Sequence, residues 1–199
     1  MADAAQLEDR LYDVAAFRAF LLARPADERW ELIAGIAVQS AAPRIAHQRI
    51  ASNFERHLNA ALRRLRPAWR ADREVGIEVS NASRYRPEPE VTVIDALTDT
   101  ERTFADHFYL VMEVPSASDR GWILESKLGF YRAHPHNRFI VIADQDRLAV
   151  TLHERGAAGS WASMTLTRPD DALVFGDLGP ICTLADIYAD TNLDPRRWA

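Results

Sequence analysis

Cysteine is nearly absent from this chain of 199 residues, which contains Cys182 alone. A single cysteine excludes an intrachain disulfide and a cysteine-based metal cluster, and it fits a reducing compartment. The sequence also lacks any apolar run close to the ~18–20 residues of a membrane span. Its first ten residues carry acids and no apolar run, unlike a signal peptide. We therefore expect a cytoplasmic protein with no membrane partner.

An excess of positive charge is missing as well, because the formal net charge is −5. This balance argues against the strongly basic surface of a general nucleic-acid binder. The charge is nevertheless uneven, since residues 44–73 contain eight arginines and two acids. Arg49, Arg56 and Arg63 recur every seven residues on the polar face of an expected helix. They could contact DNA, although a solvated surface is the commoner role of such a stripe.

Lysine is the scarcest charged residue, because the chain has 23 arginines and one lysine, Lys127. Arginine stays charged in proteins, whereas lysine is compact, flexible and able to shift its pKa. A lone lysine in an arginine-rich chain therefore indicates a position that arginine cannot serve. Chance survival of one lysine would give the same count.

Length and composition fit one domain over residues 1–199, with 48% hydrophobic and 27% charged residues. Apolar residues spaced by three and four predict helices at Tyr12–Arg24, at Ile45–Leu65, from about Gly121 to Ala133 with Ser118 or Asp119 as its cap, and from Thr183. Alternating or continuous apolar runs predict strands within Trp30–Gln39 (two strands around Gly35), Trp69–Ser80, Val91–Ile94, Phe108–Val114 and Phe139–Ala143, and a hairpin of Leu148–Glu154 with Trp161–Thr167. We expect an α/β fold of the mixed α+β kind, with a mixed central sheet flanked by helices.

Three charged residues stand at positions that the hydrophobic pattern predicts to be buried. Glu90 begins an expected strand after Pro89, and Glu113 lies near the end of the most apolar strand. Lys127 falls within the apolar stripe of its helix, beside Leu128, so it should face the sheet. Glutamate and lysine are rarely buried without a partner, because an isolated buried charge is very costly.

Two interpretations of these residues are open. The simpler one is a buried Glu113–Lys127 ion pair, whose Coulomb gain can be cancelled by desolvation. The functional one adds Glu90, because two carboxylates on neighbouring strands can hold Mg²⁺ or Mn²⁺ together with waters. The metal would activate a water and neutralise charge on a scissile phosphate. Lys127 would orient or deprotonate that water and stabilise the developing charge.

Several short stretches then occur in a recognisable order: WELIAG at 30–35, AHQRI at 46–50, RPEPEV at 86–91, LVMEVPS at 110–116, Lys127-Leu128 through Tyr131, and FIVIAD at 139–144. Together they resemble the PD-(D/E)XK nuclease superfamily and, more closely, the bacterial Uma-two family of proposed restriction endonucleases. The resemblance implies a restriction-endonuclease-like core, a site that uses Mg²⁺ or Mn²⁺, and DNA as the partner. It places Glu90 and Glu113 at the two acids of the motif and Lys127 at its lysine, moved to the following helix. It also marks Glu31 and His47 as neighbours of the site.

Two positions depart from the family pattern. The first acid is normally aspartate, and Glu90 is one methylene longer, so Glu88 on the same strand face is a possible substitute or second ligand. Relatives also tend to carry an acid four residues before the lysine, where this chain has Ile123. A second hypothesis is therefore a non-catalytic nuclease-fold protein that binds nucleic acid or another protein. The resemblance and the several tryptophans also lead us to expect a homodimer.

Overall fold

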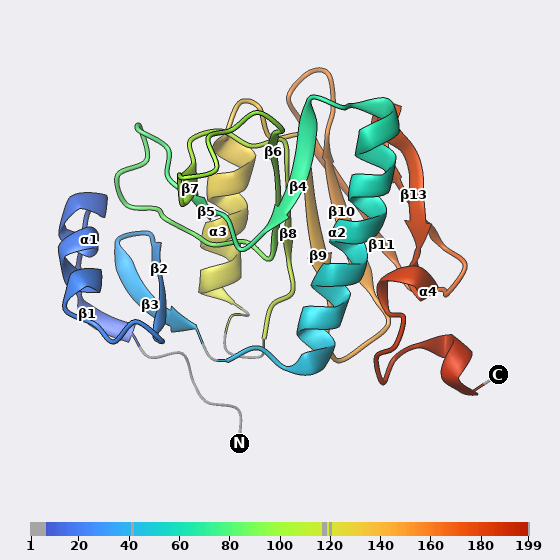
Figure 1. Ribbon diagram of the computed structural model, residues 1–199, viewed down its shortest axis with the longest axis horizontal. Coiled ribbons are helices and arrows are strands. Elements are labelled where there is room, and N and C mark those ends of the chain that lie inside the picture. Colours follow the sequence, from blue (N-terminus) through green and yellow to red (C-terminus); the bar gives the residue numbers. More distant parts are fainter. Residues whose placement is uncertain (1–6, 41, 117–118, 120, 199) are drawn as a thin grey trace.

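One mixed six-stranded sheet organises the chain (Figure 1). The computed structural model describes residues 7–40, 42–116, 119 and 121–198. The strand order is β11 (Trp161–Leu166), β10 (Val150–Arg155), β9 (Phe139–Ala143), β8 (Leu110–Glu113), β6 (Val91–Asp95) and β4 (Trp69–Arg73). Neighbouring strands are antiparallel except β8 and β9. Parallel neighbours require a crossover, which contains helix α3 (Trp122–Ala133).

The two faces of this sheet are covered by different helices, because successive side chains along a strand point to opposite faces. On one face, Leu110 and Met112 belong to a core that includes Phe54 from the long helix α2 (Ile45–Leu65). On the other face, Val111 belongs to a core with Tyr131 of α3. The mixed sheet flanked by helices confirms the fold expected from the sequence. None of the described helices combines the length and apolar character that crossing a membrane requires.

A separate three-stranded sheet lies at the N-terminal side. Its order is β1 (Leu7–Leu11), β3 (Ile36–Ser40) and β2 (Arg29–Ile33), and helix α1 (Val14–Leu22) packs against it. Ala34 and Gly35 connect β2 to β3 with φ of 53° and 87°, a left-handed turn that glycine adopts without strain. Ile33 at the end of β2 packs against Ile123 of α3. This contact holds β2 beside the helix that carries Lys127.

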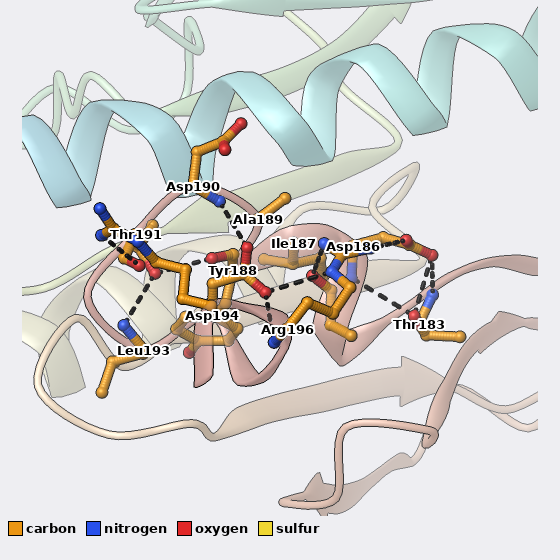
Figure 2. A network of polar contacts seen from close by, with 12 residues as sticks. Thr183, Asp186, Ile187, Tyr188, Ala189, Asp190, Thr191, Leu193, Asp194 and Arg196 are labelled. Carbon is orange, nitrogen blue, oxygen red and sulfur yellow. Dashed lines mark hydrogen bonds and ion pairs between the residues drawn. The ribbon is translucent and has the colours of Figure 1, made fainter. Parts of the chain in front are cut away.

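The C-terminal segment is fixed to α2 by polar contacts. It comprises β12 (Ala172–Phe175), the 3-10 turn η1 (Gly176–Leu178), β13 (Gly179–Thr183), α4 (Leu184–Ile187) and the 3-10 turn η2 (Pro195–Trp198). Thr183 and Asp186 form a capping box of α4, and Arg196 contacts Asp186 and Asp194 in the network of Figure 2. The buried Asn53 of α2 donates to the carbonyl oxygens of residues 187 and 189 at 3.0 and 2.9 Å. The network therefore stabilises a segment that has little regular structure of its own.

Three local expectations are wrong. The strand expected over Trp69–Ser80 ends at Arg73, because Glu74 turns the chain with φ 56°. The chain then continues as β5 (Gly76–Ile77), which pairs with β7 (Phe104–Ala105). Asp119 does not cap α3, since its carboxylate accepts the Ser116 N–H at 3.0 Å and the helix begins after Gly121; Ser118 lies outside the described residues. Finally, β6 begins at Val91, so Glu88 and Glu90 precede the strand instead of sharing one of its faces.

Candidate active site

Lys127 lies at the centre of a buried polar cluster, as its helical spacing predicts. Lys127 exposes 5% of its surface to solvent. The Nζ atom lies 2.8 Å from Oε1 of Glu31 and 3.2 Å from Oε2 of Glu113. Burial lowers the pKa of Lys127, but the charges of Glu113 and Glu31 outweigh it, and the net shift is upward. The ammonium therefore stays protonated and is shared by two carboxylates from two different sheets.

Glu113 is the last residue of β8 and points toward α3, because it follows Val111 in the alternation along the strand. The Tyr131 hydroxyl donates to its Oε1 at 2.5 Å, one helical turn beyond Lys127. Burial raises the pKa of Glu113 to about 7, with Lys127 opposing the shift and Glu31 and Glu90 adding to it. Burial is therefore the main reason that the Glu113 carboxyl resists ionisation, and the neighbouring carboxylates add to it.

Glu31 is brought to the cluster by β2. A pair of backbone hydrogen bonds joins Leu32 to Arg86, at 2.8 and 3.2 Å, so β2 lies along the segment before β6. The Glu88 N–H then donates to Oε1 of Glu31 at 2.7 Å. Burial and the nearby Glu31 raise the pKa of the Glu88 carboxyl. Glu31 thus connects the N-terminal sheet, the segment of residues 86–90 and α3.

Glu90 lies beside His47, which the resemblance marked as a neighbour of the site. Its Oε1 lies 2.8 Å from Nε2 of His47, which stands in the first turn of α2 and is 8% exposed. Glu90 is nonetheless close enough to Glu113 to raise the pKa of that carboxyl. The structure therefore brings Glu31, Glu113 and Lys127 into direct contact, with the His47–Glu90 pair adjoining them.

The three arginines of the α2 stripe are all exposed. Arg49 donates to the carbonyl oxygen of Asp190 in the C-terminal segment. A guanidinium nitrogen of Arg56 lies 3.5 Å from Nε2 of His57. A contact of Arg49, Arg56 or Arg63 with nucleic acid stays a prediction.

Tyr131 is the residue of the cluster to which the sequence assigned no role. It reads as one more apolar position in the stripe of α3. The available signal was its spacing of four residues from Lys127, which places both side chains on one helix face. Its hydroxyl occupies one oxygen of Glu113 and Lys127 contacts the other, so both oxygens of this carboxylate have a partner.

Two carboxylates of the cluster are the candidates for holding a divalent cation. Mg²⁺ typically binds one or two protein carboxylates and keeps several waters. Glu113 and Glu90 are two carboxylates of this kind, and Glu90 adds to the upward pKa shift of Glu113 that burial mainly causes. Among the described residues, however, no three histidine, cysteine, aspartate or glutamate side chains already form a metal-binding group.

The chain is similar to known proteins in two comparisons. The Uma2 family model, described as "Putative restriction endonuclease", matches residues 14–180. A similar solved structure is that of "a putative nuclease belonging to DUF820" from Anabaena variabilis ATCC 29413, with a TM-score of 0.65 and 17% sequence identity. That match covers 85% of this chain and 95% of the other, and at this identity it shows the fold alone. None of the curated proteins matches this sequence.

Proposed function

Because the chain belongs to the Uma2 family, we propose that it is a metal-dependent nuclease that hydrolyses phosphodiester bonds of DNA at the site around Lys127. The single observation that carries the proposal is the buried ammonium shared by Glu31 and Glu113. Buried ion pairs add little net stability, since apolar side chains of similar volume often do as well or better. A chain with one lysine among 23 arginines therefore keeps it here for a purpose other than packing.

Each side chain of the cluster has a role in this proposal. Glu113 and Glu90 would hold Mg²⁺ or Mn²⁺, with Glu88 as a further candidate ligand. The bound ion supplies a Lewis acid that activates water and neutralises phosphate charge. Lys127 stabilises the negative charge that develops on the phosphate oxygens.

Three neighbours support these groups. Glu31 and Tyr131 hold Lys127 and Glu113 in their orientations. His47 does the same for Glu90. The exposed arginines of α2 are candidates for contacts with the DNA backbone, which specify position more than sequence.

The test is cleavage of supercoiled plasmid DNA in Mg²⁺ or Mn²⁺. We expect nicking by the unmodified protein and a loss of about a hundredfold or more in Glu113→Gln and Lys127→Met. Glu125→Gln is the matched control, because Glu125 is an exposed carboxylate on the same helix. Equal cleavage by all four proteins would show that a contaminant cuts the DNA. A parallel assay on single-stranded RNA decides between the two nucleic acids.

A non-catalytic binding protein is the competing function, and the full occupation of the Glu113 oxygens by Lys127 and Tyr131 favours it. Calorimetric titration with Mn²⁺ separates the two. A nuclease should bind Mn²⁺ with defined stoichiometry and lose that binding in Glu113→Gln. A binding protein should take up no Mn²⁺ and still retain DNA in a filter assay.

A further inference from the structure

The two edges of the six-stranded sheet differ in their protection. Exposed strand edges normally carry charges, proline or bulges, because an unprotected edge pairs with another strand. The edge strand β4 carries Arg70, Asp72 and Arg73, and the first two form an ion pair at 2.8 Å. The opposite edge strand, β11, has the sequence WASMTL, with no charge and no proline. Within the described chain, no strand lies beyond it.

The middle of β11 is exposed on both faces, whereas Trp161 and Leu166 at its ends pack against the core. Its four central residues, 162–165, are all exposed, although side chains alternate between the faces. Met164 is 56% exposed, among the larger exposures of an apolar side chain in this structure. A second strand could therefore approach the β11 edge along its exposed central residues.

The register of the β10–β11 hairpin shows which backbone groups point outward. Gly156 donates to the Ser160 oxygen at 2.8 Å, whereas the Arg155 N–H turns away to Arg138 at 2.9 Å. Arg155 is opposite Trp161, so that pair lacks hydrogen bonds within the hairpin. Bonded and non-bonded pairs alternate along an antiparallel ladder. The N–H and C=O groups of Trp161, Ser163 and Thr165 therefore face the free edge.

We propose that β11 of a second copy of this chain pairs antiparallel with this edge, centred on Ser163. In such an antiparallel pair, a residue that precedes Ser163 by some number of positions faces the residue that follows Ser163 by the same number in the other copy. Ser163 then faces Ser163 of the second copy, and Trp161 faces Thr165 in both directions. All three outward residues are satisfied at once, and Met164 lies beside Ala162 of the second copy.

A second copy is the partner that fits this edge best. Two identical strands related by a twofold axis present the same surface to each other, as in most soluble dimers. Because β11 has no charge, the self-pairing brings no like charges together. The pairing doubles the sheet, and open sheets of 8–15 strands are known. The inference concerns assembly alone and does not depend on the proposed nuclease activity.

Sedimentation of the full chain at tens of micromolar tests the interface. We expect a dimer for the unmodified protein and a folded monomer for Ser163→Pro, which removes an outward N–H and leaves the ladder with β10 intact. Ser163→Thr keeps the N–H and should stay dimeric. Met164→Lys should also give a monomer, whereas Val174→Lys, at another exposed apolar strand position, should not. A monomeric unmodified protein, or a dimeric Met164→Lys variant, overturns the proposal.

Cross-linking tests the register separately. Facing residues of a hydrogen-bonded antiparallel pair have Cα atoms about 5.5 Å apart, within disulfide range. Ser163→Cys should therefore form a dimeric disulfide under mild oxidation. Thr165→Cys should not, because Thr165 faces Trp161 of the second copy. The native Cys182 is buried and should not react in either variant. Cross-linking through position 165 and not 163 contradicts the proposed pairing.

Discussion

Lys127 is the cation that two buried carboxylates share, so removing its charge leaves Glu31 and Glu113 without that partner. Breaking a buried pair by deleting one partner typically costs about 3–5 kcal/mol. We expect Lys127→Met to lower the free energy of unfolding by that amount in urea titrations at neutral pH. Adding Glu31→Gln to Lys127→Met should recover part of the loss. A loss in Lys127→Met below about 1 kcal/mol would mean that the pair is solvated.

His107 links two acidic side chains at the opposite end of β6 from Glu90. Its Nε2 lies 2.6 Å from Asp95 and its Nδ1 lies 2.9 Å from Asp106. The hydrogen bond to Asp95, aided by Asp106 and opposed by burial, raises the pKa of His107. Because the pKa of His107 is higher in the folded chain than in the unfolded chain, the protonated imidazole stabilises the fold. This stabilisation is fully present below the pKa of histidine in the unfolded chain, about 6.5, and is lost as pH rises through the folded pKa.

The prediction for His107 is therefore a pH-dependent difference in melting temperature. Unmodified protein should exceed His107→Gln near pH 6, and the two should converge near pH 9. Asp95 and Asp106 are ionised throughout that range, since the pKa of each is lowered. A difference in melting temperature that grows with rising pH would contradict the predicted direction of the His107 contribution.

At the scale of single residues, the sequence predicted the burial of Glu113 and Lys127 and their contact. The reason is that charged residues inside an apolar pattern need partners. It could not predict that Glu31 would be the nearer partner of Lys127, or that His47 would contact Glu90. Both contacts join segments that are distant in the chain, and no local spacing encodes them. The catalytic and metal-binding roles of these residues stay predictions.

The short helix α4 depends on its cap more than on its length. Thr183 accepts the Asp186 N–H at 3.3 Å and the Asp186 carboxylate accepts the Thr183 N–H at 3.0 Å, as Figure 2 shows. Loss of a capping hydroxyl typically costs about 1 kcal/mol. We expect that loss for Thr183→Ala in chemical unfolding, and little change for Thr103→Ala in an exposed loop. Equal effects of the two substitutions would argue against the cap.

At the scale of elements, strong periodicity gave the most accurate predictions. The bounds of α2 and β9 agree with the sequence because an amphipathic stripe and a continuous apolar run are unambiguous. The two-residue strand β7 has no such pattern and was missed, and β5 was expected only as part of one longer strand with β4. The break after β4 was missed because Glu74 adopts a left-handed conformation that is uncommon for glutamate.

At the scale of the whole molecule, helix α3 joins the N-terminal sheet to the six-stranded sheet. Ile123 of α3 packs against Ile33 and Val38 of the N-terminal sheet, directly beside the Glu31–Lys127 contact. Truncating a buried isoleucine to alanine typically costs about 2–5 kcal/mol. We expect Ile123→Ala to destabilise the chain by this amount. Hydrogen exchange should accelerate more in β2 and β3 than in β8 and β9, and uniform acceleration would show that the sheets unfold as one unit.

At this scale the sequence predicted one mixed sheet with helices on it, because strand and helix signals alternate along residues 45–143. It did not predict that the N-terminal strands would form their own sheet. That outcome follows from the packing of β2 against α3, which sequence periodicity does not report. The same packing supplies Glu31, so the complete cluster requires both sheets.

Because it is the one lysine of the chain, Lys127 can also serve as a chemical probe of the buried cluster. Apart from an α-amino group, Lys127 is the one primary amine available to reductive methylation or an acylating reagent. Its burial and its upward-shifted pKa keep it unreactive while α3 stays docked. Labelling detected by mass spectrometry at this position should therefore measure how often the cluster opens. Any ligand that separates the ammonium from its carboxylates should become visible as faster modification, with no other side-chain amine to obscure the signal.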